Sequence, residues 1–103
     1  MVVEIVSEGA EHPPAGAPLL VQVLDTTYAD APARVVAETT AEVAPTGRQN
    51  VELHPRLESG GDYRVRAHVD VDRDGAVSPG DFVTTAAHPA REGEPVRVIV
   101  RKI

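Results

Sequence analysis

The sequence predicts an all-β protein, a single prealbumin-like or immunoglobulin-like β-sandwich of about seven short strands. Three observations support this class: short β-branched runs, alternation of apolar and polar residues within them, and Gly, Pro and Asp between them. With 103 residues, the chain is expected to form one domain, residues 1–103, around one modest core. The expected strands are residues 2–7, 19–25, 34–40, 51–57, 63–69, 82–85 and 95–101.

The first two strands are separated by a segment rich in Pro and Gly. Residues 2–7 form a β-branched run and are expected at a sheet edge, because residues 8–18 contain breakers that cannot continue a central strand. Residues 19–25 carry apolar side chains on both faces, which predicts burial on both sides.

The later strands follow from β-propensity and period-two alternation. Residues 34–40 are rich in Val and Thr, which favours a strand over a helix. In residues 51–57 apolar and polar side chains alternate, and Pro55 places that strand near a sheet edge. Residues 63–69 and 95–101 alternate in the same way, so each is expected to turn its apolar row toward the core.

The segment from residue 70 to residue 81 has the spacing of a twelve-residue calcium loop. In such a loop, oxygen ligands come from positions 1, 3, 5, 7 (backbone carbonyl), 9 (often through water) and 12, with Gly at position 6. Gly75 falls at the turn position. The residues expected to hold the ion are Asp70, Asp72, Asp74, Ala76, Ser78 and Asp81. Because Asp stands at position 12 in place of the usual Glu, we expect weak Ca²⁺ binding, roughly 10⁻⁴ to 10⁻³ M, with Mg²⁺ as a competitor.

A metal-free acidic loop is the alternative, because Asp and Gly are also preferred in turns that satisfy their own backbone donors. The flanks, residues 63–69 and 82–85, read as strands, so an ion here would fasten a sheet and not move the helices of an EF-hand sensor. Asp25 and Asp30 bracket another loop. We expect each to cap its own turn, and to extend the acidic cluster only if the fold brings them near Asp70.

Composition excludes several classes of protein. The net charge is −6 and no basic patch is interleaved with aromatic residues, which argues against a nucleic-acid partner. The absence of Cys removes disulfides and thiolate chemistry. Aromatic residues make up 3% of the chain, so Tyr28, Tyr63 and Phe82 are the few large side chains available as core anchors.

The sequence contains no apolar run long enough for a membrane span, and its start lacks the features of a signal peptide. As written, it predicts a cytoplasmic protein, and an extracytoplasmic one where a signal or anchor segment has been removed.

Catalytic motifs are missing: the sequence has no nucleophile elbow, HExxH pair, phosphate-binding loop or dinucleotide fingerprint. His54 and His68 could face outward on adjacent strands, but they are expected to be solvated surface residues, as are Arg64 and Arg66 beside His68. We therefore expect no enzymatic activity.

Residues 19–30, 35–38 and 62–69 resemble the YbaY-like family, which is related to the small lipoprotein chaperones, or pilotins, of type III secretion. The resemblance spans roughly residues 17–101 and rests on strand patterns. It implies a prealbumin-like sandwich without enzymatic activity that binds or chaperones another protein. The Cys that would carry the lipid is absent.

Two functional hypotheses follow. The first is a noncatalytic β-sandwich, stabilised by calcium in the loop of residues 70–81, that serves as a protein-binding or scaffold module. The alternative is a metal-independent, chaperone-like module that binds an extended peptide at a strand edge.

Overall fold

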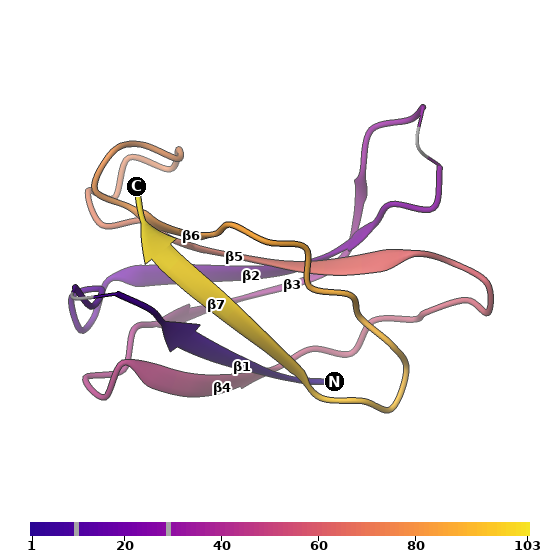
Figure 1. Ribbon diagram of the computed structural model, residues 1–103, viewed down its shortest axis with the longest axis horizontal. Coiled ribbons are helices and arrows are strands. Elements are labelled where there is room, and N and C mark those ends of the chain that lie inside the picture. The colour runs from indigo at the N-terminus through magenta and orange to yellow at the C-terminus, as the bar shows by residue number, and fades with distance from the viewer. Residues whose placement is uncertain (10, 29) are drawn as a thin grey trace.

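The computed structural model describes residues 1–9, 11–28 and 30–103, and these residues form strands but no helix. The prediction of an all-β chain with seven strands is confirmed (Figure 1). The strands are β1 (Val2–Ser7), β2 (Pro18–Asp25), β3 (Arg34–Glu42), β4 (Arg48–Glu52), β5 (Tyr63–Val69), β6 (Phe82–Thr84) and β7 (Val96–Lys102). Within the described ranges, no helix is available that could cross a membrane.

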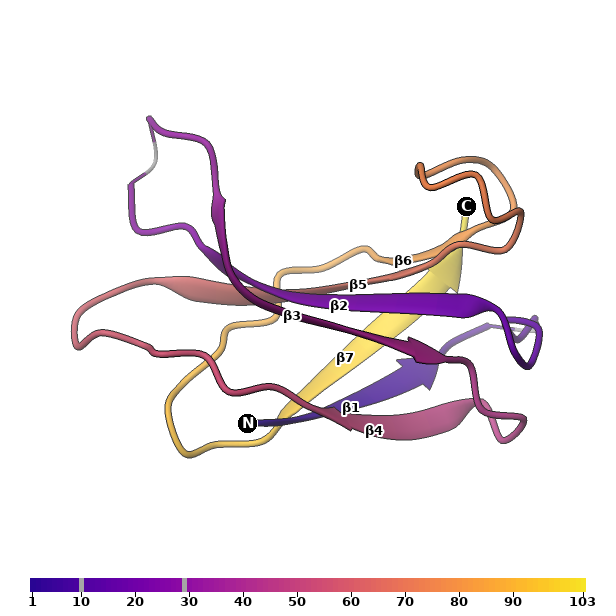
Figure 2. The same ribbon diagram turned by 180° about the vertical axis from the view of Figure 1, so that it is seen from behind.

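All seven strands belong to one sheet, in the order β3-β2-β5-β6-β7-β1-β4. Figures 1 and 2 show that this sheet curls, so that its β3-β2-β5 part faces its β7-β1-β4 part. The expected sandwich of two sheets is therefore only partly right. The short strand β6 pairs with both β5 and β7, so the sheet continues through the corner where a sandwich would be divided.

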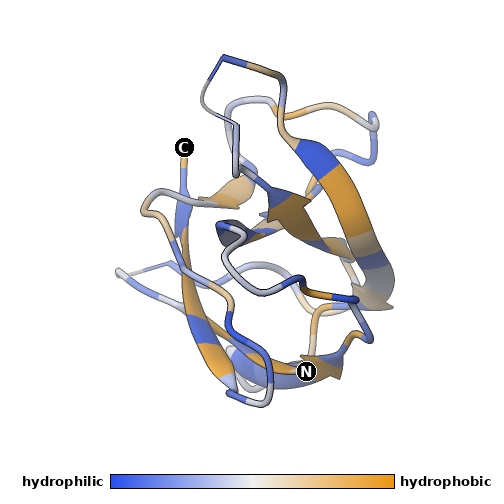
Figure 3. Cartoon of the chain, turned by 90° about the vertical axis from the view of Figure 1, so that its right-hand side faces the viewer, coloured by the Kyte–Doolittle hydropathy of each residue, from blue (hydrophilic) through white to orange (hydrophobic). Residues whose placement is uncertain are grey.

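The core fills the inside of the curl. On β2, Leu19, Val21 and Val23 are at most 1% exposed, whereas the alternate residues are half-buried. The predicted inward rows of β5 and β7 are confirmed, and they consist of Tyr63, Val65, Ala67, Val69, Val96, Val98 and Val100. In Figure 3 the hydrophobic colour follows the strands, while most connecting segments are white or blue.

Two strands differ from the expectation. The first, β1, is not an edge strand, because it pairs in parallel with β7 on one side and antiparallel with β4 on the other. The strand expected at residues 51–57 begins earlier, at Arg48, and ends at Glu52. Glu52 is paired with Val2, the first residue of β1, and beyond this pair Leu53 and Met1 exchange two further hydrogen bonds.

The aromatic residues divide into two groups. Tyr63 and Phe82 are 6% and 3% exposed and anchor the core as expected. Tyr28 is 71% exposed, so the prediction that it anchors the core is wrong. It lies in the β2–β3 connection, which projects away from the sheet and carries it out of reach of the core (Figure 1).

The two edge strands, β3 and β4, are joined by the turn of residues 43–47 (Figure 2). Next to this turn, the side chain of Gln49 on β4 forms hydrogen bonds to the backbone at the end of β3, with which β4 has no strand pairing. Its Oε1 accepts a hydrogen bond of 2.8 Å from the Ala44 N–H, and its Nε2 donates one of 3.0 Å to the Glu42 carbonyl. Gln49 thus fastens the two edges at this end.

Candidate functional site

The acidic loop of residues 70–81 connects β5 to β6. Its backbone enters the left-handed region at Arg73 (φ 57°) and at Gly75 (φ 78°). Glycine adopts that region without steric cost, so Gly75 stands at the turn that the motif requires. The loop is also held from outside, because the Arg73 guanidinium donates a hydrogen bond of 3.1 Å to the Gly16 carbonyl.

Three acids of this loop, the half-buried Asp70 and the exposed Asp72 and Asp74, accept hydrogen bonds from the loop itself. Asp70 accepts bonds from the N–H groups of Gly75 (2.8 Å) and Asp74 (3.3 Å). Asp74 accepts one of 3.0 Å from the Ala76 N–H, and Asp72 accepts one of 2.8 Å from the Ser78 hydroxyl. The bonds to Asp70 and Asp74 are the local side-chain-to-backbone bonds that Asp makes in turns, and the bond to Asp72 joins two side chains.

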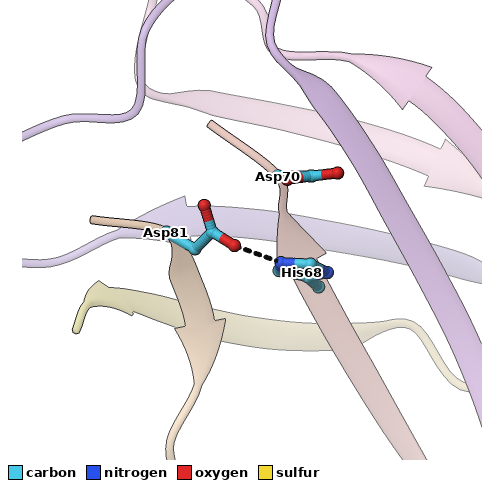
Figure 4. Close-up of side chains that lie close together, drawn as sticks. All are labelled: His68, Asp70 and Asp81. Carbon is cyan, nitrogen blue, oxygen red and sulfur yellow. Dashed lines mark hydrogen bonds and ion pairs between the residues drawn. The ribbon is translucent and has the colours of Figure 1, made fainter. Parts of the chain in front are cut away.

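Asp81 is 1% exposed and forms the buried base of the loop. Its carboxylate accepts hydrogen bonds from the Val71 N–H (2.9 Å), the Ser78 N–H (3.2 Å) and Nε2 of His68 (2.8 Å; Figure 4). The bond from His68 is the main cause that lowers the pKa of Asp81, and the two backbone bonds add to it against the opposing effect of burial. Asp72 also has a lowered pKa, chiefly because of the Ser78 hydroxyl.

His68 differs from its expected role. The sequence predicts a solvated residue, but His68 is 8% exposed, because the acidic loop folds back and places Asp81 against its ring. His54 follows β4 at the far edge of the sheet, so the two imidazoles are not on adjacent strands. Strand alternation predicts that His68 lies on the outer face of the sheet. Alternation does not indicate which loop covers that face.

The structure brings the predicted acidic ligands together. Carboxylate oxygens of Asp70, Asp72, Asp74 and Asp81 all lie within 4.8 Å of one another. Oxygen donors at this spacing fit the chemistry of a hard cation such as calcium. Ser78 lies beside two of these acids, whereas Ala76 contributes its N–H to Asp74. The same bonds also fit the metal-free alternative, so calcium binding stays a prediction.

Asp25 caps its own turn, as expected. Its Oδ1 accepts bonds from the Thr27 N–H (3.0 Å) and hydroxyl (2.6 Å), which lower its pKa. Asp25 ends β2, whereas the Asp70 N–H bonds to the carbonyl of Pro18, where β2 begins. The length of a strand therefore separates Asp25 from the acidic loop. Asp30 is exposed in the connection that follows Asp25.

An open hollow of about 440 Å³ lies beside the start of β5, at the other end of that strand from the acidic loop. Its lining includes the apolar or aromatic residues Leu57, Tyr63 and Ala90 and the charged residues Glu58, Arg91 and Glu92. The four side chains with shifted pKa values lie outside this hollow: Asp25, Asp72, Asp81 and His88. This hollow and the groups with shifted pKa values are thus in different places.

The outer edge of β3 is a second candidate surface. The Asp70 N–H bonds to the Pro18 carbonyl, so the even-numbered residues of β2 face β5 and the odd-numbered ones face β3. Through the observed register, the residues of β3 that face β2 are Ala37, Thr39 and Ala41. The N–H and C=O groups of Glu38 and Thr40 therefore point away from the sheet, where no strand of the described chain pairs with them.

Comparison with known proteins shows the fold. No model of a known protein family matches the chain, and no curated protein matches it. A solved structure, described as an alternative pilotin from the type II secretion system of Vibrio cholerae, is similar with a TM-score of 0.76 at 19% identity, covering 100% of this chain and 95% of that one. The chain thus has a pilotin-like fold. Nothing in the comparisons supports the YbaY-like family or type III secretion.

Proposed function

We propose that this protein is a noncatalytic module that binds an extended segment of another protein along the open edge of β3. The observation that carries the proposal is the outward row of backbone N–H and C=O groups at Glu38 and Thr40. Such a row is a template for strand addition, in which main-chain hydrogen bonds supply affinity. The pilotin-like fold supports a role in binding protein, since the neighbour is part of a secretion system.

The other edge of the sheet is less suited to this role. The strand β4 has 5 residues, against 9 in β3. Its inner face carries Gln49, whose side chain is already bonded to the backbone of Glu42 and Ala44. A short edge is one of the means by which proteins avoid strand addition, so β3 is the favoured side.

Proline substitution tests the proposal. The N–H groups of Thr40 on β3 and Asn50 on β4 both point away from the sheet, because Ala41 and Val51 occupy the positions that face the neighbouring strands. Thr40→Pro and Asn50→Pro therefore each remove one outward donor and leave the internal ladders intact. We expect a partner identified by affinity purification to be lost with Thr40→Pro and kept with Asn50→Pro. Equal recovery with both folded variants would refute β3 as the binding edge.

We also propose a structural calcium ion in the acidic loop, favoured by the proximity of the four carboxylates. Bound calcium would offset their mutual repulsion and stabilise the folded state by mass action. The test is thermal unfolding of chelator-treated protein with and without millimolar calcium, repeated with magnesium. We expect calcium to raise the midpoint and Asp72→Ala to abolish that rise. An unchanged midpoint at several millimolar calcium would refute the calcium proposal and favour the metal-free acidic loop.

A further inference from the structure

The side chains along the β3 edge indicate which kind of strand could be added there. The side chains of an added strand would alternate between the two faces of the sheet. One row would lie next to the inner residues of β3, and the other row next to its outer residues. On the inner face, Ala37, Thr39 and Ala41 are short and only half-buried. Ala37 and Ala41 pack against the margin of the core, as does Val51 of β4. This margin offers apolar surface that larger apolar side chains could cover.

The outer face of the same edge is acidic. Glu38 and Glu42 are exposed and alternate with the short inner residues. Glu38 is oriented by a hydrogen bond of 3.0 Å from Nε2 of Gln22 on β2. Opposite charges on directly paired residues stabilise a sheet and like charges destabilise it, so this row favours Lys or Arg on an incoming strand.

The protein contains this pairing elsewhere in its own sheet. On β1, Glu4 lies between the buried residues Val3 and Ile5. On the adjacent strand β7, Arg97 lies between Val96 and Val98, which are also buried. Nε of Arg97 donates a hydrogen bond of 2.8 Å to Oε1 of Glu4. An apolar row inside and a Glu–Arg pair outside thus join two neighbouring strands of this fold.

From these observations, and resting on the proposed function, we infer that the β3 edge selects an extended partner segment in which apolar residues alternate with Lys or Arg, as Arg97 stands between Val96 and Val98 in β7. A second copy of the chain fits this edge less well. It would bring another strand with Glu38 and Glu42, on a protein whose net charge is already −6. The Gln49 contact to the Glu42 carbonyl limits the usable edge to the part of β3 before that residue.

Defined peptides test this inference. The first probe is a short, end-blocked peptide that alternates lysine with valine, and the second has glutamate in place of lysine. A third has the lysine–valine sequence with backbone N-methylation of the residues that would bond to β3. Binding is followed by NMR chemical-shift changes at the backbone amides of Glu38 and Thr40. We expect the first peptide to bind at least tenfold more tightly than either of the others.

Charge reversal identifies the cause of that preference. Replacing both Glu38 and Glu42 by Lys is expected to reverse the order of the lysine and glutamate peptides, whereas Glu52→Lys, on the outer face of β4, should leave it unchanged. If both peptides bind equally at β3, the inferred charge rule is wrong and the proposed binding edge stands. If peptide contacts map away from β3, both are wrong. Dimers in solution that Thr40→Pro dissociates would show a second copy at this edge and overturn the inference.

Discussion

Nε2 of His68 and Oδ2 of Asp81 lie 2.8 Å apart, and both side chains are buried. Their contact joins the end of β5 to the residue that precedes β6, so it closes the acidic loop at its base. Asp81 also accepts two backbone bonds there. This carboxylate thus holds the loop closed in the absence of a metal ion.

Replacement of this carboxylate should destabilise the fold. Asp81→Asn keeps the size of the side chain but removes its charge and part of its capacity to accept bonds from His68, Val71 and Ser78. Buried donors left without a partner are costly, so we expect the melting temperature in chelator to fall by several degrees. Asp74→Asn, at an exposed position of the same loop, should have little effect.

The pH dependence provides the check on that result. Because the folded state lowers the pKa of Asp81 below its ordinary value of 3.8, its stabilisation is present above that pH and is lost as pH falls through the folded pKa. The difference in melting temperature between wild type and Asp81→Asn should therefore become smaller at acid pH. A difference that stays constant would show that size or packing, and not ionisation, causes it.

Protonation of His88 is expected to lower the free energy of unfolding at mildly acid pH. Burial lowers its pKa from the ordinary value of 6.5, so the unfolded chain binds a proton before the folded one does. The contribution of His88 to the free energy of unfolding is therefore largest above about pH 6.5 and decreases as pH falls through that value toward the folded pKa. Urea unfolding between pH 7.5 and 5.5 is expected to show a smaller decrease for His88→Leu. His54→Leu, at an exposed position, is the control.

The core should be most sensitive on the inner face of β2. Leu19 is 1% exposed, whereas Leu20 on the opposite face is half-buried. Leu19→Ala is expected to lower the free energy of unfolding by about 2–5 kcal/mol, the usual cost of emptying a close-packed site. Leu20→Ala should cost clearly less. Similar losses in denaturant unfolding would contradict the assignment of the two faces.

Gln49 should be needed to hold the two edge strands together. Gln49→Ala removes its bonds to the Ala44 N–H and the Glu42 carbonyl, and we expect a loss of about 1–2 kcal/mol in the free energy of unfolding. Hydrogen exchange at the Ala44 amide should become faster in this variant. Unchanged exchange there would mean that the turn of residues 43–47 is held without the side chain.

Much of the strand pattern could be predicted from local sequence. Residues 2–7 and 63–69 coincide with β1 and β5, because alternation and β-branched residues mark a strand with one buried row. The start of β4 could not be recognised, since Arg48, Gln49 and Asn50 are polar and Gln49 acts through its side chain. The parallel pairing of β1 with β7 depends on tertiary contacts that local periodicity does not encode.

The candidate site shows the same division between local and long-range information. The Asp spacing predicts that four carboxylates lie close together, as they do in the structure, because the conformation of a turn depends on residues that are neighbours in sequence. The burial of His68 against Asp81 depends on how the whole loop folds over the sheet. The open edge of β3 depends on strand order, which brings residues distant in sequence together.

The parallel ladder between β1 and β7 also bears on how the chain folds. Its paired residues, such as Glu4 and Arg97, are 93 positions apart in the sequence. Nearly the whole chain must be present before this ladder can form, and the entropy of closing so long a loop opposes its early formation. During synthesis, β1 can pair with β4 first, and its parallel ladder with β7 forms only after β7 has emerged.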